Sequence, residues 1–309
     1  MAGKSVGYLT FNFGANMGGF NKAMKKAQSR VKRFGKSMRS VGSSMTRGLT
    51  MPIIGLGAIA IKTFANFEQS MLKVKAVSGA TASEFKILSD SAKALGSSTM
   101  FTASQVADLQ FELAKLGFDP KEIKDATGNI LALAQATSTD LAESGRIAAV
   151  ALNGFNLEAS QSARVADIMA MASSSSAMDM EKFGAALPKV AAAARISGDT
   201  FEVMSAKLQV LADSGMEGAK MGTQLKIMYG QLADKGLTWD EAMGKLQTSS
   251  DKLKDAQVLF GKNAANAAIT MSESTAKINE YEKANLDAAG TSKKLADIMD
   301  SGAMGAMRR

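Results

Sequence analysis

The sequence contains no cysteine and no histidine among its 309 residues. Without cysteine, the chain has no disulfide, no thiolate nucleophile and no cysteine ligands for zinc or haem attachment. Histidine is the usual general base near neutral pH, so an enzyme would have to rely on Asp, Glu, Lys or Ser. We therefore expect a protein that is not an enzyme, with no catalytic residues, no cofactor and no metal site.

Proline and aromatic residues are also scarce. The prolines are Pro52, Pro120 and Pro188, and the aromatic residues are 14 Phe, 3 Tyr and 1 Trp. Helix-forming residues such as Ala, Leu, Met, Lys and Glu dominate instead. Because 46% of the residues are hydrophobic, part of the chain can bury a core. The composition predicts an all-α protein.

Acidic residues are missing from the first 67 positions, which hold eleven basic residues. The net charge of the whole chain is +8, so the positive excess lies in this segment. Apolar residues spaced three or four apart predict a basic helix over about 20–45 with one apolar stripe. Such an asymmetry suggests an interaction arm. Its candidate contact residues are Lys22, Lys25, Lys26, Arg30, Lys32, Arg33, Lys36 and Arg39.

The basic arm has two interpretations. It docks its apolar stripe on a core and leaves the lysines in water, or it lies on nucleic acid, a membrane surface or another subunit. No aromatic residues interleave the charges, as stacking on bases would require, so docking is favoured over nucleic acid. The apolar run 51–61 is shorter than the roughly 20 residues that span a bilayer and is interpreted as part of a buried helix over 53–77.

From residue 81 onward, capping signals and amphipathic segments alternate. A hydroxyl or carboxylate at the cap, followed three residues later by Glu or Gln, predicts a helix start. The predicted caps are Thr81–Glu84, Thr102–Gln105, Asp119–Glu122, Asp199–Glu202 and Thr238–Glu241. The predicted helices cover 81–95, 102–117, 120–136, 139–152, 158–175, 178–195, 199–213, 217–234 and 238–248.

Three regions follow from these patterns. Residues 1–66 form a basic amino-terminal arm with an apolar helix, and residues 67–248 form a compact multi-helix core domain joined by short connections. From 249 the sequence stays helix-forming, but its apolar face thins, so 249–309 is predicted to be a looser helical extension.

The segment Ser214–Met228, SGMEGAKMGTQLKIM, has the glycines of a phosphate-binding loop but lacks its context. Such a loop needs Gly-x-x-x-x-Gly-Lys-Ser/Thr after a strand, whereas the preceding segment has helical spacing. Gly215 is instead predicted to end a helix. Gly218 and Gly222, four apart on one helix face, are predicted to admit a neighbouring backbone. The carboxylates Asp179, Glu181 and Asp213 show no pairing in the sequence.

Several segments together carry a family resemblance. They are FEQSMLKVKAVSGATASEF (67–85), ALGSSTMFTASQVADLQFELAKLGF (94–118), the stretch 126–187, ADSGMEGAKMGTQLKIM (212–228), LFG (259–261) and the upstream LTMPIIGLG (49–57). This pattern resembles the core domain of phage tail tape measure proteins, and it covers most of the chain.

The resemblance implies a structural virion protein. Such proteins lie as several copies in the lumen of a phage tail tube, template the tube, set its length and leave it during DNA ejection. The implied partners are the tail tube protein, tail assembly chaperones and baseplate or tail-tip proteins, with host envelope contact as a further expectation. The implied locations are the virion and, during assembly, the host cytoplasm. The alternative is a helical nucleic-acid or membrane-surface binding protein acting through the basic arm.

Overall fold

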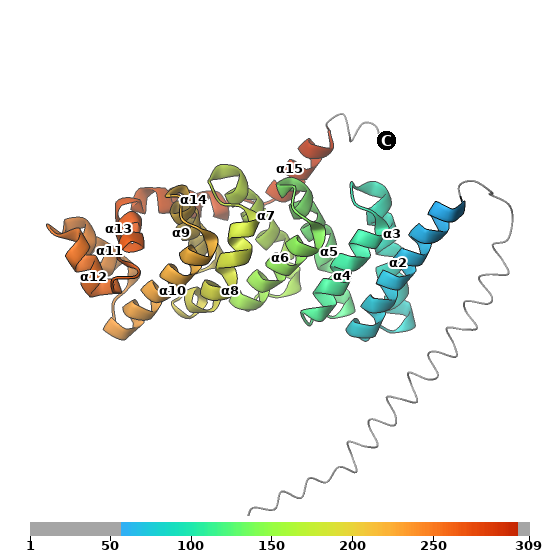
Figure 1. Cartoon of the computed structure of the whole chain (residues 1–309), viewed down its shortest axis with the longest axis horizontal. Helices are drawn as coiled ribbons and strands as arrows, with labels where there is room; N and C mark the ends of the chain where they lie inside the picture. Colours follow the sequence, from blue (N-terminus) through green and yellow to red (C-terminus); the bar gives the residue numbers. More distant parts are fainter. Residues whose placement is uncertain (1–56, 302–309) are drawn as a thin grey trace, which may run out of the picture. The chain divides into compact units, whose positions relative to one another are not determined.

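The computed structural model describes residues 57–301, which form fourteen α-helices, one short 3₁₀ helix and no strand (Figure 1). The all-α prediction is therefore confirmed for this part of the chain. The basic arm and its predicted helix lie outside the described residues. The helices are α2 (Gly57–Ser78), α3 (Ala82–Ser98), α4 (Ala103–Lys115), α5 (Pro120–Thr137), α6 (Leu141–Phe155), η1 (Ala159–Gln161), α7 (Ser162–Ser175), α8 (Met180–Ile196), α9 (Phe201–Asp213), α10 (Gly218–Lys235), α11 (Trp239–Thr248), α12 (Lys252–Phe260), α13 (Ala265–Glu273), α14 (Thr275–Leu286) and α15 (Thr291–Asp300).

Four of the five predicted caps set helix starts as expected. At Thr81, Thr102, Asp119 and Thr238 the side chain accepts the third helical amide, and the Glu or Gln three residues on accepts the cap amide. Each reciprocal pair satisfies two amides that otherwise lack partners at a helix start. The sequence thus locates the beginnings of α3, α4, α5 and α11.

The predicted cap at Asp199 is wrong. Thr200 is the N-cap of α9, and its hydroxyl accepts from the Val203 amide. Asp199 instead binds Lys207, and Glu202 binds Arg164 of α7. Asp199 is thus the counter-charge of the buried Lys207, and Glu202 pairs with Arg164, so neither carboxylate completes the predicted capping box.

Several helices between α4 and α10 pack on partners two positions away in the chain order. Helix α8 lies between α6 and α10, α5 packs on α7, and α4 packs on α6. Three phenylalanines join α6, α8 and α9: the ring centroids of Phe155 and Phe201 are 5.5 Å apart, and those of Phe183 and Phe201 are 6.5 Å apart. Burying such rings, with edge contacts, supplies a large share of the apolar stabilisation at this junction.

The carboxy-terminal helices between Lys252 and Asp300 pack on one another and on earlier helices. Helices α12 and α13 pack on each other, α13 also packs on α9 and α11, and α14 packs on α9. Helix α15 returns to α5 and α7, beside which it is drawn in Figure 1. The described residues from Ile61 onward belong to one compact unit. Polar side-chain contacts hold this segment, and such contacts cannot be predicted from the spacing of its apolar residues.

Candidate functional site

The glycine-rich segment Ser214–Met228 contains the turn between α9 and α10 and the first part of α10, and the element before it is a helix and not a strand. Helix α9 ends at Asp213, and Gly215 follows with a φ of +81°, a left-handed conformation that favours glycine. Helix α10 then starts at Gly218. A strand-to-helix phosphate cradle is therefore absent at this turn.

Gly218 and Gly222 face α8 at very short range. A Cβ atom built on Gly218 would lie 2.7 Å from Cα of Lys182, and one on Gly222 would lie 2.5 Å from the carbonyl oxygen of Ala186. These distances leave no room for a side chain, so the α8 and α10 backbones approach each other directly. The glycines act here by their lack of a side chain, which permits helix packing and not ligand binding.

The carboxylates Asp179 and Asp213 are occupied by structural contacts. Asp179 caps α8 by accepting from the Lys182 amide at 2.7 Å. Asp213 accepts from the Ala177 amide at 2.8 Å and from Lys277 and Tyr281 at 2.5 Å each. Burial raises the pKa of the Asp213 carboxyl, but these hydrogen bonds lower it by a larger amount. The net pKa of Asp213 therefore lies below its usual value. Asp213 thus remains ionised and joins α9 to α14.

A buried charge cluster around Lys207 escapes the sequence analysis. Lys207 Nζ lies 2.6 Å from Asp199 Oδ2 and 3.6 Å from the centroid of the Trp239 ring, and the Tyr229 hydroxyl donates to the same carboxylate. Burial lowers the pKa of Lys207 although Asp199 opposes this, and burial together with Asp199 raises the pKa of Tyr229. The only sequence signal was the single tryptophan.

The Lys207 cluster contains the groups of an acid–base site, but a substrate could not reach the Lys207 ammonium group. A lysine with a lowered pKa beside a carboxylate is a known catalytic arrangement. However, the Lys207 side chain is only 3% exposed, and the Trp239 ring covers its ammonium group. The cluster therefore joins α9, α10 and α11 as a buried ion pair with a cation–π contact.

One shallow pocket of about 500 Å³ lies where α5 and α7 end and α8 begins. Its polar lining consists of hydroxyls and two carboxylates, Thr137, Ser138, Thr139, Ser173, Ser174, Asp179 and Glu181. No basic side chain lines it, and its carboxylate Asp179 caps α8. Between residues 57 and 301 there is also no group of three acidic residues that could hold a metal ion.

Two further findings bound the site. No helix in the described part of the chain has both the length and the apolar character needed to cross a membrane. The basic residues from Lys22 to Arg39 fall outside the described range.

Comparison with known proteins identifies a family that matches most of these helices. The family model described as phage-related minor tail protein matches residues 89–300, from within α3 to the end of α15. It therefore extends beyond residue 248, the predicted end of the core domain. No solved structure matches the chain.

Two curated relatives align with nearly the whole chain. The tape measure protein of Pneumococcus phage Dp-1 is 27% identical over 91% of the chain, which corresponds to 28% of that protein. The probable tape measure protein of Escherichia phage P2 is 26% identical over 90% of the chain and 38% of its own length. The chain thus spans about a third of the length of these relatives. Since the family model covers more than half of it, the chain belongs to the phage-related minor tail protein (tape measure) family.

Proposed function

We propose that this chain is a structural phage tail protein that works as a tape measure. In this role it occupies the lumen of the tail tube, templates tube assembly, determines tail length and is released during DNA ejection. The observation that carries the proposal is the family match over residues 89–300, supported by two relatives whose names state this role. The chain covers only part of those relatives, so the role of the whole protein is carried over as a proposal.

The contacts that the charged side chains make support a structural role for the chain. Asp179, Asp213 and Lys207 each serve helix capping or helix–helix contacts. In the described part of the chain these groups form no accessible acid–base pair. A non-catalytic protein whose helices are held by such contacts is consistent with the tape measure family.

The proposed partners are those of a tail under assembly. They are the tail tube protein, the tail assembly chaperones and the baseplate or tail-tip proteins, and several copies of the chain share one tail. The proposed location is the virion, in the tail lumen, after a period in the host cytoplasm.

We also propose that the helical body changes its form on entering the tube. A compact body of this length has a radius of gyration of about 18 Å, which is wide for a narrow lumen. The body would therefore be folded outside the tube and extended, helix after helix, inside it. Density for the folded body within the lumen of assembled tails, seen by electron cryomicroscopy, would contradict this.

The test of the measuring role is an in-frame duplication of residues 57–301 in a phage that carries the gene. If the segment lies extended as helix, each tail should lengthen by about 370 Å, at 1.5 Å per residue. Electron micrographs give the tail lengths, and a synonymously recoded gene serves as the control. An unchanged tail length would show that this segment does not measure.

A second candidate function rests on the charge of residues 1–56. This segment holds ten basic and no acidic residues, which suits a DNA or anionic membrane surface. Neutralising Lys25, Lys26, Lys32 and Arg33 should then abolish DNA affinity that falls steeply with salt. Absence of binding by the unchanged chain at low salt would exclude DNA as the partner.

A further inference from the structure

The last two described helices lie back across much earlier parts of the chain. Residues 275–300, called the strap below, comprise α14 and α15. Helix α14 packs on α9 and α7, and α15 packs on α7 and α5 (Figure 1). The amide of Gln135 donates to the Ala296 carbonyl at 3.0 Å, although 161 positions separate the two residues.

The strongest anchor of the strap is a carboxylate on α7. Asp167 accepts from the amides of Gly290 and Ser292 at 2.7 and 2.9 Å and from the Ser292 hydroxyl at 2.6 Å. The N-cap of α15 is Gly290, which offers no side chain. Asp167 therefore supplies, from another helix, the cap that α15 lacks.

Two further polar anchors hold α14. Asn285, fully buried, donates to the Glu202 carbonyl at 3.1 Å and to Gln209 Oε1 at 2.9 Å. At the other end of the helix, Asp213 binds Tyr281 and Lys277. All these anchors join side chains or amides of the strap to α7 and α9.

The apolar contribution of the strap is small. Its buried apolar side chains are Ile278, Tyr281 and Ala296 in the two helices and Ala288 between them, whereas the thirteen residues of α9 include seven buried apolar ones. On detachment, water can replace the polar partners of the anchors, and the strap itself exposes few apolar side chains. Separation of the strap therefore costs less than opening the body.

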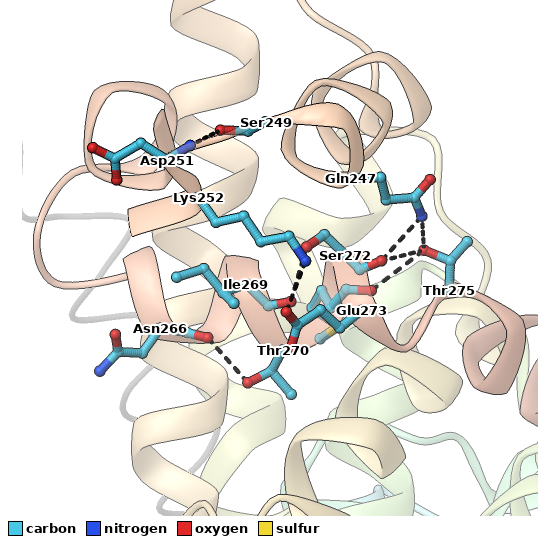
Figure 2. Close-up of polar contacts among 11 residues, drawn as sticks. Gln247, Ser249, Asp251, Lys252, Asn266, Ile269, Thr270, Ser272, Glu273 and Thr275 are labelled. Carbon is cyan, nitrogen blue, oxygen red and sulfur yellow. Dashed lines mark hydrogen bonds and ion pairs between the residues drawn. The ribbon is translucent and has the colours of Figure 1, made fainter. Parts of the chain in front are cut away.

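The root of the strap is fixed independently (Figure 2). The side-chain amide of Gln247 donates to the Ser272 carbonyl at 3.0 Å and to Thr275 Oγ1 at 2.8 Å, and Lys252 pairs with Glu273 at 2.8 Å. The bonds to Ser272 and Glu273 attach the end of α13 to α11 and α12, and the bond to Thr275 holds the first residue of the strap to α11. Only Ser274 separates α13 from α14, so a hinge at this position can move the strap without moving α13.

We propose that the strap detaches from α5, α7 and α9 as one unit while the body formed by α3–α13 stays folded. Its departure uncovers a groove in which Asp167, Gln209 and Asp213 lose the partners that the strap provides. In the closed form the strap therefore fills that groove. It is the first part of the fold to open. This inference concerns the folded chain alone and holds whether or not the chain measures tails.

The chain has no cysteine, so single buried thiols can report opening. Ala288→Cys and Ala296→Cys place probes in the strap, and Ala194→Cys places one in α8; all three alanines are buried. In the full-length chain, a soluble thiol reagent should label both strap probes at similar rates. These rates should exceed that of the α8 probe by about tenfold or more, since local opening precedes global unfolding.

A second variant tests the anchor. Asp167→Ala, added to each probe, should raise the labelling rate of both strap thiols by about tenfold and leave the α8 thiol unchanged. Asp167→Asn keeps one acceptor oxygen, which can serve Ser292, but turns an NH2 donor toward the Gly290 amide. It should therefore label at a rate between those of the parent and Asp167→Ala, and Asp90→Ala serves as the remote control. Equal rates for all three probes in the otherwise unchanged chain would overturn the proposal. A fast Ala296 probe with an Ala288 probe as slow as α8 would do so too, because it indicates fraying of the chain end.

Discussion

At the scale of single residues, Gly222 shows how the lack of a side chain determines packing. Gly222→Ala would place a methyl group 2.5 Å from the Ala186 carbonyl oxygen, so α8 and α10 must separate. We expect a loss of about 1–3 kcal/mol in the free energy of unfolding, as for other overpacked sites. Urea unfolding followed by circular dichroism measures it.

Gly230 provides the matched control on the same helix. A Cβ at this position meets nothing within 4 Å, so Gly230→Ala should stabilise α10 by about 0.5–1 kcal/mol through helix propensity alone. Equal effects at the two positions would show that the close approach to α8 carries no energetic weight.

Lys207 gives a second prediction at this scale. Lys207→Met leaves the Asp199 carboxylate buried without its cation, which should cost about 3 kcal/mol in the free energy of unfolding. The double variant Lys207→Met, Asp199→Asn removes both charges and keeps an acceptor for Tyr229, so it should return to within about 1 kcal/mol of the parent. Urea titrations of the three proteins decide it, and a double variant as unstable as the single one would contradict this account.

The sequence reveals individual residues only where their partners are local. Thr102 and Asp119 bind groups three positions away, and both caps were predictable. Asp199 binds Lys207 eight positions on and lies against Tyr229 from another helix. Its partners depend on the tertiary fold, so the local pattern led to the wrong cap.

At the scale of helix pairs, Glu202 of α9 and Arg164 of α7 make a pH-dependent contact. Burial raises the pKa of the Glu202 carboxyl. The guanidinium group opposes this with two hydrogen bonds, at 2.5 and 2.6 Å, and the net pKa of Glu202 lies below its usual value. A carboxyl with a lowered folded-state pKa adds stability above its unfolded-state pKa. That contribution is lost as the pH falls through the folded-state pKa.

Arg164→Met should therefore destabilise the protein by about 2–3 kcal/mol near pH 7. The difference from the parent should be smaller at about pH 4 than at pH 7, because burial without the cation raises the pKa of Glu202 in the variant and its carboxyl takes up a proton as the pH falls. Urea unfolding at both pH values measures the difference, and Arg146→Met, which breaks an exposed pair with Glu143, is the control. A difference that does not change with pH would assign the effect to lost packing.

Helix positions were largely predictable from the sequence, but their attachments were not. Caps and apolar spacing identified the helices from α3 to α11. The packing of α14 and α15 depends on Asn285 and on Asp167, a carboxylate 123 positions from Gly290. A polar anchor of this kind leaves no periodic signal, so the thin apolar face was interpreted as loose attachment.

At the scale of the whole molecule, charge divides the chain into two parts. Residues 1–56 carry ten basic and no acidic side chains, so deleting them changes the net charge at pH 7 from +8 to −2. The full chain should bind a cation exchanger and elute only at raised salt, whereas the shortened chain should not bind. Weak retention of the full chain would show that its own acidic residues already neutralise the arm.

The way Asp167 caps α15 has a consequence for reversibility. Helix α15 has ten residues, and isolated helices of this length are marginal in water. Once separated from Asp167, the segment should melt into a flexible coil, which gains conformational entropy. Reattachment then requires folding on contact, so the open and closed forms should interconvert as two distinct states and not through a continuum of partly docked helices.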